Sequence, residues 1–292
     1  MTACAFIGLG VMGYPMAGHL AAAGLDVSVY NRTKAKAEQW VAEHGGKLAT
    51  TPRAAAENAD FVFTCVGNDD DLRAVVLGPH GALAGMQDGA ILVDHTTTSA
   101  EVARQLAEAC SDKNCAMLDA PVSGGEAGAV NGALTIMVGG TAASYAKAEP
   151  VMAHFARASK LMGPAGAGQL TKMVNQICIG GLLQGLSEAL NFADKAGLDG
   201  RQVVETISKG AAQSWQMENR FETMIDDSFD FGFAVDWMVK DLQICLDEAA
   251  RNGADLPVTE LVKGYYQEVQ QMGGGRWDTS SLIRRLRTLE SK

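Results

Sequence analysis

A glycine-rich turn near the start of the chain limits its fold more than any other feature. The glycines at positions 8, 10 and 13 follow the apolar run of residues 3–7, and a helical pattern begins directly after them. In this context Gly8 permits a tight turn, Gly10 lets the backbone approach a phosphate closely, and Gly13 lets the helix pack on the strand. The spacing therefore predicts a strand, a phosphate-binding turn and a helix. The alternative is a glycine turn that serves packing alone.

The six residues of this turn are candidates for binding a dinucleotide, because backbone N–H groups at the start of a helix point toward an anion there. They are Gly8, Leu9, Gly10, Val11, Met12 and Gly13. A turn with this spacing between a first strand and a first helix is typical of chains that bind a nicotinamide dinucleotide. It therefore favours an oxidoreductase.

The residues after the second predicted strand indicate which dinucleotide is used. NAD-binding chains place an acid there, about 20 residues beyond the turn, to bind the adenosine ribose. Here the segment Asn31-Arg32-Thr33 contains no acid. An acid would repel the 2′-phosphate of NADP, whereas Arg32 can bind it with two hydrogen bonds and Thr33 can donate another. We predict that these three residues contact NADP, with NAD as the second choice of cofactor. The alternative for Arg32 is a solvated loop arginine.

Short apolar runs alternate with helical patterns through the first half of the chain. The runs predict buried strands at residues 3–7, 27–30, 61–66, 91–94, 116–118, 134–138 and 158–162. Strands separated by helices are typical of an α/β fold with a doubly wound parallel sheet. We therefore predict a Rossmann domain over residues 1–163.

The strand pattern disappears beyond residue 163. Residues 169–196 have a helical pattern that ends before Gly197, and Asp199 can cap a further helix that runs to about residue 209. Residues 236–251 form another helical pattern, which ends before Gly253. Pro257 stands at a first-turn position of a further helix. The sequence therefore predicts an all-α C-terminal domain over residues 164–292.

Charge and cysteine content exclude several classes of function. The chain has 292 residues, a formal net charge of −10 and a pI of about 5.0, which argues against a nucleic-acid partner. None of the six cysteines forms a C-x-x-C pair or a cluster with zinc spacing, so we expect no metal site and reduced cysteines in the core, such as Cys178. No signal peptide or membrane segment is recognisable. We therefore expect a cytoplasmic protein without a membrane partner.

Four separated blocks resemble the β-hydroxyacid dehydrogenases, and together they extend over nearly the whole chain. They are FIGLGVMGYPMA at 6–17, DAPVSGG at 119–125, GAGQLTKMVNQ at 166–176, and KDLQICLD at 240–247. The resemblance implies that the third block supplies the catalytic lysine, Lys172, with Asn175 beside it. Spacing of three residues places both on one face of a helix. The alternative for Lys172 is a lysine on a solvated helix face.

The second block resembles the family's substrate loop. Ser123 offers a hydroxyl, and Gly124 and Gly125 expose backbone N–H groups, which together suit a carboxylate. The resemblance implies that these residues bind the acid group, that Ser123 takes part in catalysis, and that Phe233 and Asp241 close over the substrate. The alternatives are a tight turn for the glycines and a surface helical carboxylate for Asp241.

Further cofactor contacts are expected where two strands end. Cys65, Val66 and Gly67 follow one of these strands. The resemblance implies two more contacts, Thr97 after the next strand and Lys240 from the fourth block. His95 is a departure, because the family more often has methionine before its hydroxyl-bearing residues. We interpret it as a loop histidine rather than a catalytic one.

The sequence thus predicts an NADPH-preferring oxidoreductase that interconverts a small carboxylate-bearing aldehyde (semialdehyde) and its hydroxy acid, with Lys172 as general acid/base. Imine reductases resemble this architecture but generally replace the lysine with Asp or Tyr. A non-catalytic NADPH-binding scaffold is the other alternative. Residues 213–217 and 231–233 are candidates for pocket selectivity. The resemblance to the family implies a homodimer or homotetramer. Gly180, Gly181 and Gly185 would allow close helix–helix approach, either to a second subunit or within one subunit.

Overall fold

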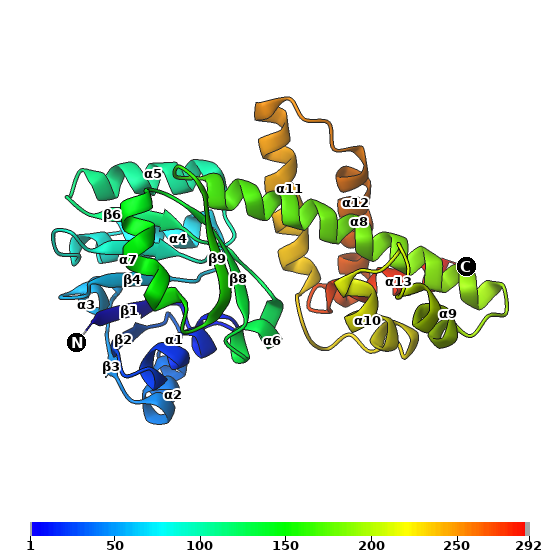
Figure 1. Cartoon of the computed structure of the whole chain (residues 1–292), viewed down its shortest axis with the longest axis horizontal. Coiled ribbons are helices and arrows are strands. Elements are labelled where there is room, and N and C mark those ends of the chain that lie inside the picture. The colour runs from blue at the N-terminus through cyan, green and yellow to red at the C-terminus, as the bar shows by residue number, and fades with distance from the viewer. Residues whose placement is uncertain (1, 290–292) are drawn as a thin grey trace. The chain divides into compact units, whose positions relative to one another are not determined.

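The computed structural model describes residues 2–289 of the chain. The chain divides into two compact units, residues 1–172 and 173–292. Figure 1 shows strands flanked by helices in the first unit and helices joined by loops in the second. The division expected between residues 163 and 164 lies in the turn before helix α8 (Ala167–Lys195), whose first residues belong to the first unit.

The described residues of the first unit form a nine-stranded sheet. The strands are β1 (Ala3–Ile7), β2 (Asp26–Tyr30), β3 (Lys47–Leu48), β4 (Phe61–Thr64), β5 (Ile91–Asp94), β6 (Ala116–Asp119), β7 (Val122–Ser123), β8 (Leu134–Gly139) and β9 (Ala156–Gly163). Their order is β3-β2-β1-β4-β5-β6-β8-β7, and β9 pairs with β8.

Most of the sheet is parallel, as predicted. Every pair from β3 across to β6 is parallel, and β8 pairs with β9 in the same sense. β8 runs antiparallel to β6 and to the two-residue strand β7. The Rossmann architecture is confirmed, and the antiparallel part is an addition that the apolar runs did not indicate.

Helices cover both faces of the sheet, which is why its central strands are apolar up to the polar residues at their carboxyl ends. Successive residues of a strand point to opposite faces. Phe6 accordingly packs with Met16 on one side, while Ile7 packs with Leu72 on the other. Burying a side chain of this size stabilises the fold by about 1.5–3 kcal/mol. The helices of this unit are α1 (Gly13–Ala22), α2 (Lys34–His44), α3 (Pro52–Ala56), α4 (Asp69–Leu77), η1 (Ala82–Ala84), α5 (Ala100–Ser111), α6 (Gly125–Val130) and α7 (Ala142–Met152).

The second unit is helical, as predicted. After α8 come α9 (Gly200–Ile207), α10 (Trp215–Ile225), α11 (Val235–Asn252), α12 (Pro257–Val269), η2 (Gln270–Gly274), η3 (Thr279–Ser281) and α13 (Leu282–Leu289). The end signals act as expected: the Asp199 side chain caps α9, Gly253 ends α11 with φ +80°, and Pro257 opens α12. Leu183 and Tyr266 lie in one apolar cluster of this unit, and Met217 lies in another.

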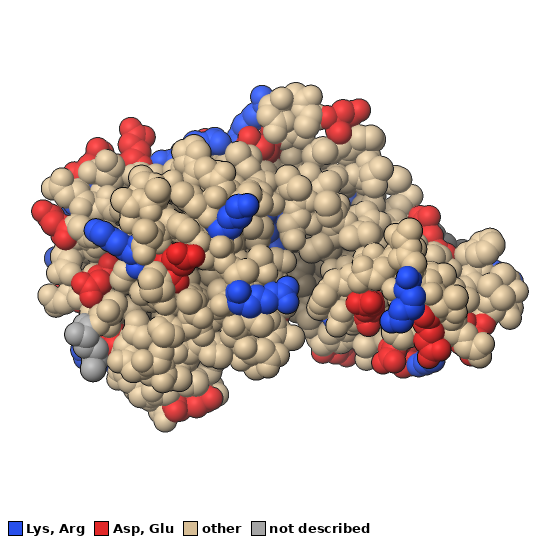
Figure 2. Space-filling view, viewed as in Figure 1, with Lys and Arg blue, Asp and Glu red and all other residues tan. Residues whose placement is uncertain are grey.

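The six cysteines, all within residues 2–289, are present as thiols. The expectation that Cys178 lies in the core is wrong, because its position on α8 is exposed. In the described part of the chain, no helix is long and apolar enough to cross a membrane. Figure 2 shows basic side chains scattered among acidic and uncharged ones on one face of the molecule.

Candidate active site

The glycine turn has the backbone geometry that the motif predicts. Gly8 has φ +100°, and a Cβ there would collide with the carbonyl oxygen of Cys65. A Cβ at Gly13 would collide with the carbonyl oxygen of Gly8, so only glycine lets α1 start this close to β1. Gly10 is exposed, and a Cβ there would meet no atom within 4 Å. The turn therefore leaves open space beside Gly10, where a pyrophosphate would approach the backbone.

Asn31 ties the glycine turn to the end of β2. Its Oδ1 accepts a hydrogen bond from the backbone N–H of Leu9 at 2.9 Å, and its Nδ2 donates to the carbonyl oxygen of Thr33 at 3.0 Å. The N–H of Leu9 is thus already engaged, and the Leu9 side chain is buried. Asn31 holds the turn in shape, a role that the sequence analysis did not foresee.

Arg32 reaches from the end of β2 toward the start of α4. Its Nη1 lies 3.0 Å from Oδ1 of Asp71, and its side chain is 86% exposed. β1 lies between β2 and β4 in the sheet, so this ion pair joins the two strand ends that flank the glycine turn. The sequence analysis missed Asp71, although three successive acids at 69–71 were a visible signal.

A buried aspartate joins the loops that follow β4 and β5. Oδ1 of Asp94 accepts hydrogen bonds from the hydroxyls of Thr64 at 2.7 Å and Thr96 at 2.6 Å, and from the N–H of Thr96 at 3.1 Å. The N–H of Val66 donates to Oγ1 of Thr96 at 3.0 Å. Burial raises the pKa of Asp94 to about 7, against the opposing effect of these hydrogen bonds. The predicted contacts Cys65, Val66, Gly67 and Thr97 lie in the loops that this network holds, and all four are half-buried.

His95 lies in the loop after β5, as interpreted from the sequence, but its side chain is buried in the core. Its ring stacks on Phe63 with centroids 5.8 Å apart and meets Phe155 edge-on at 5.3 Å. Nδ1 lies 2.6 Å from the carbonyl oxygen of Ala120 and donates to it. Burial lowers the pKa of His95 to about 4, so the ring is neutral at pH 7. His95 links the loop after β5 to the segment that leads into the Ser123 loop.

The Ser123 loop follows β6. Ser123 lies at the end of β7, which pairs with β8, and is half-buried. Gly124 and Gly125 come next with φ +132° and +62°, conformations that favour glycine, and Gly125 opens α6. The predicted acid-binding residues are therefore consecutive on one sharply turned segment at the end of the sheet.

Lys172 lies in the second turn of α8 and is 7% exposed. Its burial excludes the alternative of a lysine on a solvated face. The first turn of α8 is held by Asp119, which accepts hydrogen bonds from the N–H groups of Gly166 and Gln169. Burial raises the pKa of Asp119, and these hydrogen bonds lower it. Asp119 belongs to the DAPVSGG block, but no local pattern distinguishes it from its neighbours.

Four polar residues form a chain of contacts in the second unit. Nδ2 of Asn175 donates to Gln176 at 2.7 Å, and Nε2 of Gln176 donates to Asp241 at 2.8 Å. Nζ of Lys240 lies 3.0 Å from the other carboxylate oxygen of Asp241. Asp241 is 2% exposed, which excludes a surface carboxylate. The predicted residues Asn175, Lys240 and Asp241 are thus brought together by Gln176, which the sequence analysis missed.

Another buried aspartate organises the segment around Phe233. The N–H of Phe233 donates to Oδ2 of Asp278 at 3.0 Å, and Nε of Arg220 lies 3.2 Å from Oδ1. The Arg220 guanidinium also lies over the rings of Trp215 and Phe231, 5.0 and 5.2 Å from their centroids. Residues from both predicted pocket segments therefore meet around one arginine.

Comparisons with known proteins agree with this architecture. A model described as the NAD binding domain of 6-phosphogluconate dehydrogenase matches residues 3–174, and one described as NAD-binding of NADP-dependent 3-hydroxyisobutyrate dehydrogenase matches residues 166–286. A protein of Shewanella frigidimarina named only as an oxidoreductase is 65% identical over 286 residues, 98% of each chain. The 2-hydroxy-3-oxopropionate reductase of Escherichia coli is 34% identical over 281 residues, 96% of each chain.

Solved structures point the same way. The structure of Mycobacterium tuberculosis 3-hydroxyisobutyrate dehydrogenase with L-serine matches with a TM-score of 0.89 and 29% identity, over 98% of this chain and 99% of that one. Both halves of the chain are therefore matched by proteins of one group. The chain belongs to the β-hydroxyacid dehydrogenase family of pyridine-nucleotide-binding oxidoreductases.

Proposed function

We propose that this chain is an NADPH-preferring oxidoreductase that interconverts a small carboxylate-bearing aldehyde and its hydroxy acid. The burial of Lys172 carries the proposal, because this lysine is withdrawn from water and belongs to the same compact unit as the glycine turn and the Ser123 loop. A lysine that served only solubility would keep its amine in water. The relative named 2-hydroxy-3-oxopropionate reductase supports the substrate class, since that compound carries both an aldehyde and a carboxylate.

The cofactor preference rests on the end of β2. The open space at Gly10 fits a pyrophosphate, and the exposed Arg32 would bind a 2′-phosphate with help from Thr33. The family model described as NADP-dependent supports the same choice. When bound, reduced nicotinamide supplies the hydride for the carbonyl carbon. The loops held by Asp94, with Val66 and Thr97, would line that ring.

The carboxylate of the substrate would bind at the Ser123 loop. The hydroxyl of Ser123 and the N–H groups of Gly124 and Gly125 are donors on consecutive residues, and they can hold an anion without a net positive charge. This binding would orient the aldehyde end of the substrate. Phe233 and Asp241 remain proposed substrate contacts, on the family resemblance.

Lys172 would donate a proton to the alkoxide oxygen as the hydride arrives, and would accept it in the oxidation direction. General acid–base catalysis of this kind contributes about 10²–10⁴-fold. Asn175 lies three residues further along α8, and Gln176 holds its amide. Asn175 would orient the substrate or the lysine.

Steady-state kinetics over a short panel tests this proposal. Glyoxylate, succinic semialdehyde, methylmalonate semialdehyde and tartronate semialdehyde are each mixed with the full chain and either NADPH or NADH. We expect turnover of at least one aldehyde, with a higher kcat/KM for NADPH. A preference for NADH would contradict the role of Arg32. Turnover of a cyclic imine without any aldehyde would identify an imine reductase, and NADPH binding without any turnover would identify a scaffold.

A further inference from the structure

We propose that Asp119 is a positioning residue for catalysis, which sets the place of Lys172 by holding the first turn of α8 against the end of the sheet. The inference rests on the proposed role of Lys172 and adds a residue that acts through it. Asp119 is not itself assigned any contact with substrate or cofactor.

The contacts of Asp119 are those of a buried helix cap. Oδ1 accepts a hydrogen bond from the N–H of Gly166 at 2.7 Å, and Oδ2 accepts one from the N–H of Gln169 at 2.9 Å. The first N–H groups of a helix have no partner within the helix, and an anion there is also favoured by the helix dipole. Asp119 is 1% exposed, so no water competes for these bonds. One carboxylate thus satisfies two donors at the start of α8.

This cap differs in its origin from the local side-chain caps that several other described helices have. Ser99, Thr141, Ser214 and Asp199 cap the helices that begin directly after them. A cap of that kind shapes the end of its own helix. Asp119 lies 47 residues before Gly166, on β6, so it locates α8 relative to the sheet. The position of every residue in the first turns of α8 then depends on this carboxylate.

Two glycines show that α8 has no room to shift at this point. A Cβ at Gly168 would collide with the carbonyl oxygens of Asp119 and Met137. A Cβ at Gly139 would collide with the carboxylate of Asp119 and lie 2.8 Å from the N–H of Ala167. The helix therefore begins in direct backbone contact with the ends of β6 and β8.

Gln169 adds a second attachment, toward the cofactor loop. It is fully buried; its Oε1 accepts from the N–H of Thr98 at 3.1 Å, and its Nε2 donates to the carbonyl oxygen of Thr96 at 2.7 Å. Lys172 follows Gln169 by three residues, almost one helical turn. Asp119 also leads directly into the Ser123 loop. The end of β6 therefore locates the proton donor, the acid-binding loop and, through Gln169, the loop beside the nicotinamide.

Kinetics on four variants test the inference. Asp119→Asn removes one acceptor and the charge, and Gly168→Ala moves the helix without altering a titratable group. Both should lower kcat about 10- to 100-fold while KM and the NADPH Kd stay within about threefold, because a shift of about 1 Å costs about 10²-fold in rate. The matched control is Asp199→Asn, which removes a helix-capping carboxylate from α9 and should leave kcat unchanged. Lys172→Ala is the fourth variant.

A double-variant cycle separates positioning from a merely structural role. If Asp119 acts through the lysine, Asp119→Asn should have no further effect on kcat in the Lys172→Ala background. Losses that multiply would overturn the inference. The inference would also be overturned if Asp119→Asn and Gly168→Ala both keep the kcat of the unaltered protein while Lys172→Ala loses activity. Full activity of Lys172→Ala would instead refute the proposed function itself.

Amide hydrogen exchange on the unaltered protein provides a test that does not depend on variants folding. The N–H groups of Gly166 and Gln169 should be strongly protected, because the buried carboxylate of Asp119 holds them. Rapid exchange of both amides, under conditions where those of α8's centre are protected, would show that the carboxylate does not fix this turn.

Discussion

Asp94 and Asp119 are register partners at the carboxyl ends of the neighbouring parallel strands β5 and β6, and both are almost completely buried. Asp94 accepts hydrogen bonds from hydroxyls at the end of β4 and in the loop after β5, whereas Asp119 accepts them from backbone N–H groups at the start of α8. Burial is the main reason that the pKa of Asp94 rises to about 7, and the charge of Asp119 raises it further. Two adjacent carboxyl groups thus organise the loops proposed for the cofactor and the helix that carries Lys172.

The raised pKa of Asp94 predicts a specific pH dependence of stability. The native state binds the proton of the Asp94 carboxyl group more tightly than the unfolded state does. This group's favourable contribution to the free energy of unfolding is therefore fully present below about pH 4 and is lost as the pH rises to about 7. Asp94→Asn should abolish that part of the profile, which amounts to about 4 kcal/mol at most. Urea unfolding of both proteins from pH 4 to 8 measures it. Parallel profiles would contradict the pKa shift.

His95 should act in the opposite direction. Its pKa is lowered to about 4, so the unfolded state takes up a proton more readily than the native state. The free energy of unfolding therefore decreases as the pH falls from about 6.5 to about 4. His95→Met keeps an apolar side chain between Phe63 and Phe155 and should remove an acid-dependent loss of about 3 kcal/mol. The comparison is the free energy of unfolding at pH 7 and at pH 4.5. An equal loss in the variant would place the acid sensitivity elsewhere.

The ion pair of Arg32 and Asp71 predicts how cofactor preference can be changed. Arg32→Ala should lower kcat/KM for NADPH about 10- to 100-fold and leave that for NADH nearly unchanged, because a charge-assisted hydrogen bond contributes about 1.5–3 kcal/mol. Asp71→Asn should raise the NADPH-to-NADH ratio, since it removes an acid 3.0 Å from the guanidinium. Asp70→Asn, one residue away on α4, is the matched control. If Asp71→Asn instead lowers the ratio of kcat/KM for NADPH to that for NADH, Asp71 is needed to orient the arginine.

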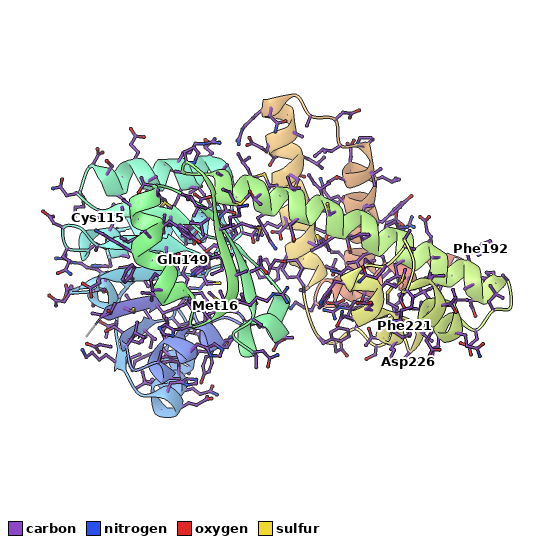
Figure 3. All side chains as sticks on the ribbon, viewed as in Figure 1. Met16, Cys115, Glu149, Phe192, Phe221 and Asp226 are labelled. Carbon is purple, nitrogen blue, oxygen red and sulfur yellow. The ribbon has the colours of Figure 1, made fainter. Side chains whose placement is uncertain are left out.

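We also predict a homo-oligomer that uses one face of α8. Val174, Leu182 and Phe192 are exposed there at 61%, 46% and 72%, and Figure 3 labels Phe192 on this helix. A Cβ at Gly181 or Gly185 would meet no atom within 4 Å, so another helix can approach closely. Light scattering after size-exclusion chromatography should give a multiple of 30.7 kDa, falling toward one chain in Leu182→Glu. A monomeric unaltered protein would refute the prediction.

The sequence predicted the elements that local physics decides. The strands around the glycine turn are largely apolar because helices cover both faces of the sheet. Asp199 caps the start of α9, Gly253 ends α11 and Pro257 opens α12, as the conformational preferences of these residues predict. It missed β3 and β7 because a two-residue strand leaves no apolar run. The predicted elements can be recognised from neighbouring residues alone, whereas the missed strands are too short to leave a pattern in the sequence.

The missed site residues share another property. Asp71, Gln169 and Gln176 act through partners 39, 71 and 65 residues away, and no local pattern marks such a partner. The burial of the loop residue His95 could not be predicted for a similar reason, because it depends on Phe63 and Phe155 from elsewhere in the chain. Long-range polar contacts are therefore the part of the candidate site that a single sequence does not reveal.

The turnover of Lys172→Ala tests the central claim most directly, with Lys209→Ala, an exposed lysine, as the control. We predict that Lys172→Ala lowers kcat for aldehyde reduction by about 10²–10⁴-fold while the Kd for NADPH, measured by fluorescence titration, is nearly unchanged. Lys209→Ala should keep the unaltered kcat. Unaltered kcat in Lys172→Ala would contradict the account.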